Sequence, residues 1–118
     1  MSAATEPGGG GVEAYAAELA VEYSRWTIGS ETLIDRASWL EGIDGWLVEG
    51  WRVVERDTRM LEIRILGEYA ATRRIVKESY VGPNGERSSS RSALAETWVR
   101  AGDGWRLLRV DANPLDDR

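Results

Sequence analysis

The fold of this chain is decided by residues 59–113, which read RMLEIRILGEYAATRRIVKESYVGPNGERSSSRSALAETWVRAGDGWRLLRVDAN. Apolar and polar residues alternate along this stretch, and three short turn sequences interrupt it: Gly67-Glu68, Gly82-Pro83-Asn84-Gly85 and Asp103-Gly104. Alternation with a period of two is typical of strands, and Gly, Pro, Asn and Asp favour the backbone conformations of tight reversals. The stretch therefore predicts three hairpins and four antiparallel strands.

The first hairpin predicts which side chains share a face. If Gly67-Glu68 is a two-residue loop, Leu66 pairs with Tyr69 and Glu62 lies opposite Arg73 as an ion pair, while Leu61 lies opposite Arg74. The other face is then the core side, and it carries Leu61, Ile63, Ile65, Ala70, Thr72, Arg74, Val76, Glu78 and Tyr80.

The same pairing can be continued through the next two turns. With a two- or four-residue loop, the core side of the third strand carries Arg91, Ala93, Ala95, Thr97 and Val99, and its back carries Leu94, Glu96 and Trp98. If Asp103-Gly104 is the last loop, Leu108, Val110 and Ala112 face inward, and a single bulged residue would reverse this.

The residues before the meander predict short elements. Residues 1–11 include four consecutive glycines and predict a disordered tail, and residues 12–19 predict a short helix of about two turns. Alternation over residues 19–26 and a second run over residues 32–34, separated by a turn at Gly29-Ser30, predict a hairpin with an edge strand.

A second helix is predicted over residues 36–41. Asp35 or Ser38 can cap it, and Glu41 follows Ser38 at the spacing of a capping box. Gly42 and Gly45 are expected to end this helix, with Trp39 and Leu40 buried. Residues 46–56 are expected to form a loop and then a strand. One domain over residues 12–114 and a tail over residues 115–118 complete the prediction.

Composition excludes several kinds of chemistry. The 118 residues include no cysteine and no histidine, so disulfides, thiolate nucleophiles, Cys/His zinc sites and a Ser-His-Asp arrangement are excluded. We expect no metal and no other cofactor. Acid-base chemistry would depend on carboxylates, tyrosines or the single lysine, Lys77.

Charge and hydropathy predict the partners that the chain would not bind. The formal net charge is -5, and the arginines are scattered among acidic residues, which disfavours nucleic-acid binding. No apolar run approaches the roughly 20 residues of a membrane span, and the N-terminus lacks the basic and apolar regions of a signal peptide. We therefore expect a soluble cytoplasmic protein.

Two surfaces are candidates for function. On the core side, small residues leave room for a cavity with Arg74, Glu78, Tyr80 and Arg91 further along the strands. The alternative is that the charged residues pair with one another at the rim and bind nothing. On the back face, Leu94, Trp98, Trp105 and Leu107 predict an apolar patch around Trp98 through which a homodimer would form, the alternative being scattered surface aromatics.

Three stretches resemble parts of SnoaL-like domains, a family in the nuclear transport factor 2-like superfamily. Residues 96–108, ETWVRAGDGWRLL, and the following DANP resemble the closing hairpin of that family. Residues 65–71, ILGEYAA, are similar to its hydrophobic-Gly-Asp-x-Ala hairpin, and residues 23–40 look like its first strand pair and following helix. The resemblance covers about residues 19–114.

The resemblance implies an α+β fold in which a curved antiparallel sheet forms a cone packed on short helices. It also implies a pocket inside the cone and dimers formed through the outer sheet face. The chain departs from the family in its N-terminal helix, which is shortened to residues 12–19. It has Asp111 and Asn113 in place of a His-x-Ser pattern, and Arg25 and Trp26 where steroid-isomerase-like members carry a carboxylate base.

Three functional hypotheses follow. The leading one is a small-molecule-binding domain in which Tyr23, Trp26 and Trp39 supply an apolar wall and Arg74, Glu78 and Arg91 orient a polar group. The second is a hydrolase, isomerase or dehydratase that uses carboxylate acid-base chemistry. Its candidates are Glu78 and Asp111, because Arg109-x-Asp111 resembles the Arg/Asp pairing of epoxide-hydrolase members, although both residues are predicted to face the back. The third is an assembly module with a vestigial pocket.

Overall fold

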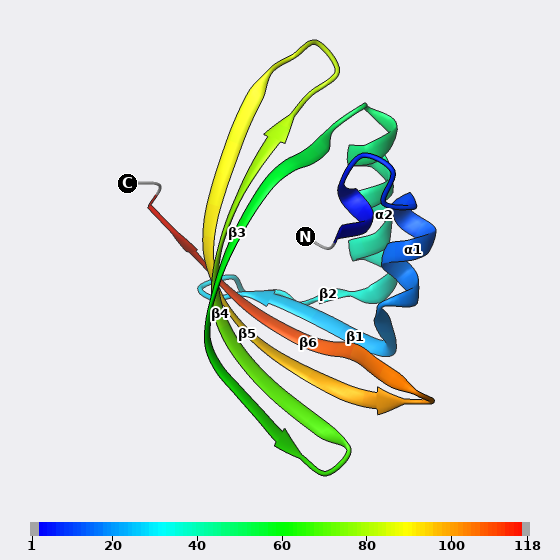
Figure 1. Cartoon of the computed structure of the whole chain (residues 1–118), viewed down its shortest axis with the longest axis vertical. Coiled ribbons are helices and arrows are strands. Elements are labelled where there is room, and N and C mark those ends of the chain that lie inside the picture. Colours follow the sequence, from blue (N-terminus) through cyan, green and yellow to red (C-terminus); the bar gives the residue numbers. More distant parts are fainter. Residues whose placement is uncertain (1–2, 117–118) are drawn as a thin grey trace.

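The computed structural model describes residues 3–116 of the chain. The elements follow the order η1 (Ala3–Thr5), α1 (Gly11–Ala17), β1 (Leu19–Thr27), β2 (Ile34–Asp35), α2 (Arg36–Val48), β3 (Arg52–Leu66), β4 (Tyr69–Val81), β5 (Arg87–Ala101) and β6 (Gly104–Leu115). Residues 1, 2, 117 and 118 of the two predicted tails lie outside this described range. The predicted α+β class is confirmed, with one curved sheet packed on short helices (Figure 1).

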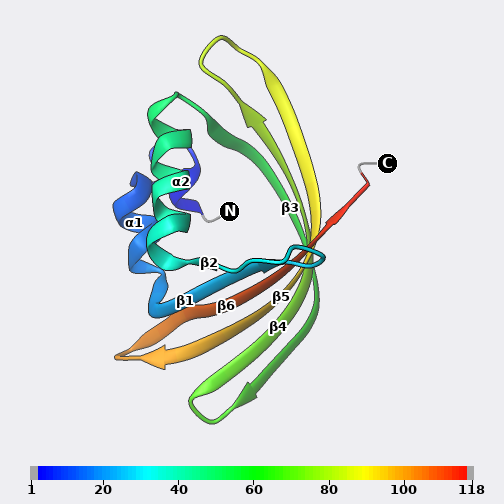
Figure 2. The ribbon, with the colours of Figure 1, turned by 180° about the vertical axis from the view of Figure 1, so that it is seen from behind.

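The strands lie in the order β2-β1-β6-β5-β4-β3. The four strands β3 to β6 form the predicted antiparallel meander, and β1 pairs antiparallel with the edge strand β2. Strand β1 also runs parallel to β6, so the first and last long strands are neighbours. Both helices lie on the concave side of the sheet, and the β3–β4 hairpin extends past them (Figures 1 and 2).

Helix α2 begins as the sequence predicts and ends later. The Asp35 carboxylate accepts a hydrogen bond from the Ser38 backbone N–H at 2.8 Å and caps the helix. The expected end at Gly42 and Gly45 is wrong, because the helix continues to Val48. Ile43 and Leu47 are buried in the core, and this packing outweighs the cost of about 1 kcal/mol per interior glycine.

The main core lies between the helices and the concave face of the sheet. Its buried side chains come from both layers: Ala4, Tyr15, Leu19, Tyr23, Ile43, Leu47, Val76, Leu94, Val110 and Ala112. Trp39 and Leu40 are only partly buried against this cluster. Ala4 and Thr5 of η1 are buried as well, so the described part of the predicted tail packs against the core. Neither helix within residues 3–116 is long and apolar enough to span a membrane.

The β3–β4 hairpin agrees with the predicted register near its turn. Leu66 pairs with Tyr69, and Glu62 pairs with Arg73, whose Nε lies 3.6 Å from the Glu62 carboxylate. A bulge between Met60 and Glu62 then places Met60, and not Leu61, opposite Arg74. Ile63 and Ile65 share the concave face with Thr72 and Ala70, but both isoleucines are largely exposed because no helix covers this end of the sheet.

The predicted facing of β5 is wrong, and the cause is the length of the β4–β5 loop. Gly82 N–H donates to the Glu86 carbonyl at 2.9 Å, which leaves Pro83, Asn84 and Gly85 as the loop, with Gly85 at φ 81°. An odd number of loop residues shifts the pairing by one and turns every side chain of the strand over. Leu94, Glu96 and Trp98 therefore face the concave side, and Arg91, Ala93, Ala95, Thr97 and Val99 face the back.

The last hairpin turns at Gly102-Asp103, because Ala101 pairs with Gly104. This differs by one residue from the expected loop. The register of the β5–β6 pair shifts by one more residue between Thr97 and Trp98. Beyond this shift the side chains of β6 face the sides that were expected, so Val110 and Ala112 are buried as predicted. Leu107 replaces Leu108 at the concave side near the turn.

Candidate functional site

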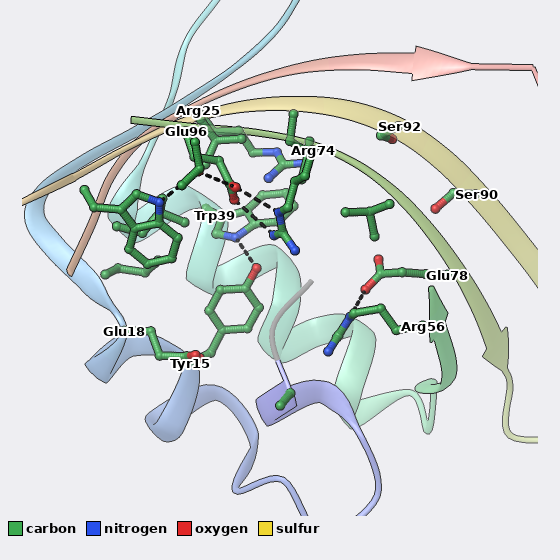
Figure 3. Close-up of a pocket in the computed structure, with 18 of the residues that line it drawn as sticks. Tyr15, Glu18, Arg25, Trp39, Arg56, Arg74, Glu78, Ser90, Ser92 and Glu96 are labelled. Carbon is green, nitrogen blue, oxygen red and sulfur yellow. Dashed lines mark hydrogen bonds and ion pairs between the residues drawn. The ribbon is translucent and has the colours of Figure 1, made fainter. Parts of the chain in front are cut away.

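A cavity of about 370 Å³ lies between the concave face of the sheet and helices α1 and α2. Strands β3, β4 and β5 supply most of its polar side chains, and α1, α2 and β1 supply Tyr15, Trp39 and Arg25 (Figure 3). Apolar side chains complete the wall: Leu19, Met60, Val76, Leu94, Trp98, Leu107 and Val110. The cavity is thus formed where the meander curves away from the helices.

The first polar group in the cavity is an ion pair between neighbouring strands. Arg74 on β4 donates to both carboxylate oxygens of Glu96 on β5, from Nε at 2.8 Å and from Nη2 at 3.0 Å. Thr72 donates to the same carboxylate at 3.1 Å and accepts from the Trp98 indole at 3.0 Å. Because Glu96 is buried and bound by three donors, its carboxylate fixes the direction of Arg74.

The second polar group lies further along the same strands. Arg56 on β3 donates from Nε to Glu78 on β4 at 3.0 Å, and the Tyr80 hydroxyl donates to the other oxygen of Glu78 at 3.0 Å. Tyr80 also shares a hydrogen bond with Ser90 of β5. Burial acts to raise the pKa of Glu78, while the bonds from Arg56 and Tyr80 are among the interactions that lower it, and its pKa lies below the ordinary value.

The helices contribute an aromatic group. The Trp39 indole of α2 donates to the Tyr15 hydroxyl of α1 at 3.2 Å, and the guanidinium of Arg25 lies 4.3 Å from the centre of the Trp39 ring. Burial raises the pKa of Tyr15 to about 12, although the hydrogen bond from Trp39 acts in the opposite direction. Burial likewise raises the pKa of Tyr80 to about 12. Both phenols are therefore protonated donors at neutral pH.

The described residues that line the cavity include three arginines and three glutamates. Arg25, Arg56 and Arg74 face Glu18, Glu78 and Glu96. No three acidic side chains within residues 3–116 are grouped as ligands of a metal ion would be. The cavity wall offers hydrogen-bond donors, paired carboxylates and aromatic surface.

Three of the six predicted binding residues line this cavity: Trp39, Arg74 and Glu78. The other three do not. Tyr23 is buried in the core, and Trp26 donates from its indole to the Ser30 carbonyl at the exposed end of β1. Ser90 and Ser92 line the cavity, so Arg91, the residue between them in the sequence, faces the opposite side of the sheet. The odd number of residues in the β4–β5 loop is the cause.

The catalytic candidates lie on different sides of the sheet. Glu78 is in the cavity, but Arg109 and Asp111 contact each other at 3.4 Å on the outer face and line no part of it. Their predicted position on the back face is confirmed, since Val110 between them faces the core.

Sequence reasoning missed several cavity residues: Tyr15, Arg25, Arg56, Glu96 and Trp98. Glu96 and Trp98 were placed on the back face, so the apolar patch expected around Trp98 is not formed there. The signal that could have found them is the Pro-Asn-Gly sequence of the second turn, because Gly85 suits the left-handed third position of a three-residue loop. Arg56 carried no comparable signal, since bulges in β3 decide where it points.

The fold is that of known proteins. An NTF2-like protein of unknown function in nutrient uptake from Rhodospirillum rubrum is similar over 97% of this chain and 91% of its own, at a TM-score of 0.75 and 17% identity. A putative Ca/calmodulin-dependent kinase II association domain from Exiguobacterium sibiricum is similar at a TM-score of 0.73 and 17% identity, over 91% of this chain and 80% of its own. A ketosteroid isomerase-like protein from Erwinia carotovora atroseptica is similar at a TM-score of 0.66 and 11% identity, over 89% of this chain and 82% of its own.

The sequence matches no family model and no curated protein. At these identities the structural similarity establishes architecture and leaves chemistry to the site. The chain has the nuclear transport factor 2-like fold, as the resemblance to SnoaL-like domains implied.

Proposed function

We propose that this protein binds a small organic molecule in the cavity of its cone. The observation that carries the proposal is the fixed direction of Arg74. Its Nε and Nη2 are bound by Glu96, and its Nη1 has no partner among the described residues. The close-up view places the Arg74 guanidinium above Tyr15 and beside Trp39, among the residues that line the cavity (Figure 3).

Tyr15 supplies a second donor to the same region. Its hydroxyl oxygen accepts from Trp39, so its proton is left for an acceptor in the cavity. A carbonyl or similar acceptor of the ligand would bind between Arg74 and Tyr15, with the apolar part of the ligand against Trp39 and Trp98. The volume of about 370 Å³ lies within the range of small-molecule sites, which is about 300–1,000 Å³.

The balanced charges favour a neutral ligand. Among the described residues, three arginines and three glutamates line the cavity, so a net charge on the ligand would meet a like charge as well as an opposite one. Binding is favoured over carboxylate acid-base catalysis, because Glu96 and Glu78 each accept hydrogen bonds from an arginine and a hydroxyl. The pKa of Glu78 lies below its ordinary value, so this carboxylate is a weaker base than a free glutamate.

The test uses neutral aromatic ketones and amides as probes, with aromatic hydrocarbons of the same size as references. Binding is followed by the indole N–H resonances of Trp39 and Trp98 in two-dimensional NMR. We expect saturable shifts with the carbonyl probes, and we expect Arg74→Lys to weaken binding about tenfold, since one oriented donor contributes about 1.5 kcal/mol.

Arg73→Lys is the matched control, because Arg73 is the next residue of β4 and faces the opposite side of the sheet. It should leave the affinity unchanged. Equal affinities for ketones and hydrocarbons, or equal losses in Arg73→Lys and Arg74→Lys, would contradict the proposal.

A further inference from the structure

Strand β3 is a free edge of the sheet. It is 15 residues long and ends the strand order, so within the described residues its outer backbone groups pair with no neighbouring strand. Such an edge can accept a further strand, and monomeric proteins commonly shield it with charges, proline or a covering element. No helix lies against the end of β3 that leads to the hairpin turn (Figures 1 and 2).

The same end of β3 is apolar and exposed. Leu61, Ile63, Ile65 and Leu66 have between 54% and 64% of their surface accessible. Ile63 and Ile65 lie opposite the smaller residues Thr72 and Ala70 on β4, so they stand above their neighbours on the concave face. A group of exposed aliphatic side chains on a free edge strand is typical of a protein-protein contact.

The two residues next to Ile63 in the sequence carry opposite charges. Glu62 and Arg64 flank Ile63 on either side, and both face the convex side. In this chain the Glu62 carboxylate lies 3.5 Å from Arg64 and 3.6 Å from Arg73, while the Arg64 side chain is 66% exposed. Arg64 therefore has surface left for another carboxylate.

We propose that a second copy of this chain pairs with β3 edge to edge, antiparallel and centred on Ile63. In a two-fold antiparallel pair the residue on the axis lies opposite itself, and the residues before and after it lie opposite one another. Glu62 of each copy then lies opposite Arg64 of the other, and the Ile63 side chains of the two copies meet on the concave face. The two sheets become continuous.

Neighbouring registers lack this complementarity. Centring the pair on Glu62 places two carboxylates opposite each other, and centring it on Arg64 does the same with two guanidiniums. A two-fold axis that passes between two neighbouring residues of β3 places charged side chains of one copy opposite isoleucines of the other. The sequence Glu62-Ile63-Arg64 thus specifies one register and one occupant, a second copy of itself.

The test is a charge exchange measured by sedimentation equilibrium of the full chain at low ionic strength. Wild type should dimerise reversibly. Glu62→Arg gives two positive residues and Arg64→Glu gives two negative residues, so each variant alone should show a dissociation constant raised at least about tenfold. An equimolar mixture of the two variants should recover an affinity within about threefold of wild type, because every pair is again between opposite charges.

Glu41→Arg is the control for net charge, since Glu41 is exposed and lies on helix α2, outside the sheet, and it should dimerise as wild type does. Thermal unfolding would verify that each variant is folded. Failure of the mixture to recover affinity, or a wild-type protein that stays monomeric at all concentrations, would overturn the proposal. A dimer that both single variants leave unchanged would assign the contact to another face and overturn it equally.

Discussion

Val53 and Ile63 lie on the same strand and on the same concave face, yet Val53 is fully buried and Ile63 is 64% exposed. The difference comes from the covering layer. Trp46 of α2 packs against Tyr80, the partner of Val53 on β4, whereas both helices stop short of the β3–β4 hairpin (Figure 1). Alternation along a strand therefore tells which face a residue belongs to, and the extent of the helices decides whether that face is buried.

The largest expected difference between the covered and uncovered regions concerns their ion pairs. Glu96→Ala should lower the free energy of unfolding by about 3 kcal/mol, because it leaves Arg74 half buried without its carboxylate. Arg73→Ala removes the ion pair with Glu62 at the hairpin and should cost less than about 1 kcal/mol, since Arg73 is 70% exposed. Urea unfolding of both variants measures the difference, and equal costs would show that burial does not distinguish the two pairs.

A smaller difference is expected for the apolar side chains. Val53→Ala removes two fully buried methyl groups and should lower the free energy of unfolding by about 2 kcal/mol. Ile63→Ala should cost less than about 0.5 kcal/mol when measured at concentrations where the protein is monomeric. A larger cost for Ile63→Ala at such dilution would mean that its side chain is buried within a single chain.

The smallest effect concerns a buried tyrosine of the covered region and appears only at high pH. The pKa of Tyr15 is raised from 10.0 to about 12, so between these values the unfolded chain loses a proton that the folded chain retains. Stability should therefore fall as the pH rises through this range. Tyr15→Phe should reduce the fall in melting temperature between pH 9 and about 11 relative to wild type. Equal slopes in Tyr15→Phe and in wild type would contradict the burial of the Tyr15 phenol.

The fold was predictable because it follows from local chemistry. Alternating strands with Gly and Asn at the turns specify a meander, and the Asp35 cap specifies the start of α2. The end of α2 was not predictable from Gly42 and Gly45, because the burial of Ile43 and Leu47 outweighs helix propensity and depends on the sheet beneath them.

The cavity was only partly predictable for a related reason. Arg74 and Glu78 were placed correctly because the Gly67-Glu68 loop has two residues, as expected. Glu96 and Trp98 were misplaced because the next loop has an odd number of residues, and one residue reverses a whole strand. Tyr15 and Arg25 reach the cavity from elements far away in sequence, and spacing along the chain carries no information on such contacts.

The parallel pairing of β1 with β6 has a consequence for how quickly this protein folds. The hairpins of the meander join residues that are close in sequence, whereas the pair of Leu19 with Leu107 closes a loop that contains most of the chain. Closing a long loop costs entropy before contacts compensate for it, and such non-local contacts slow folding. We expect the meander to form early and the β1–β6 contact to form last. Substitutions at this seam should then speed unfolding and leave the folding rate nearly unchanged.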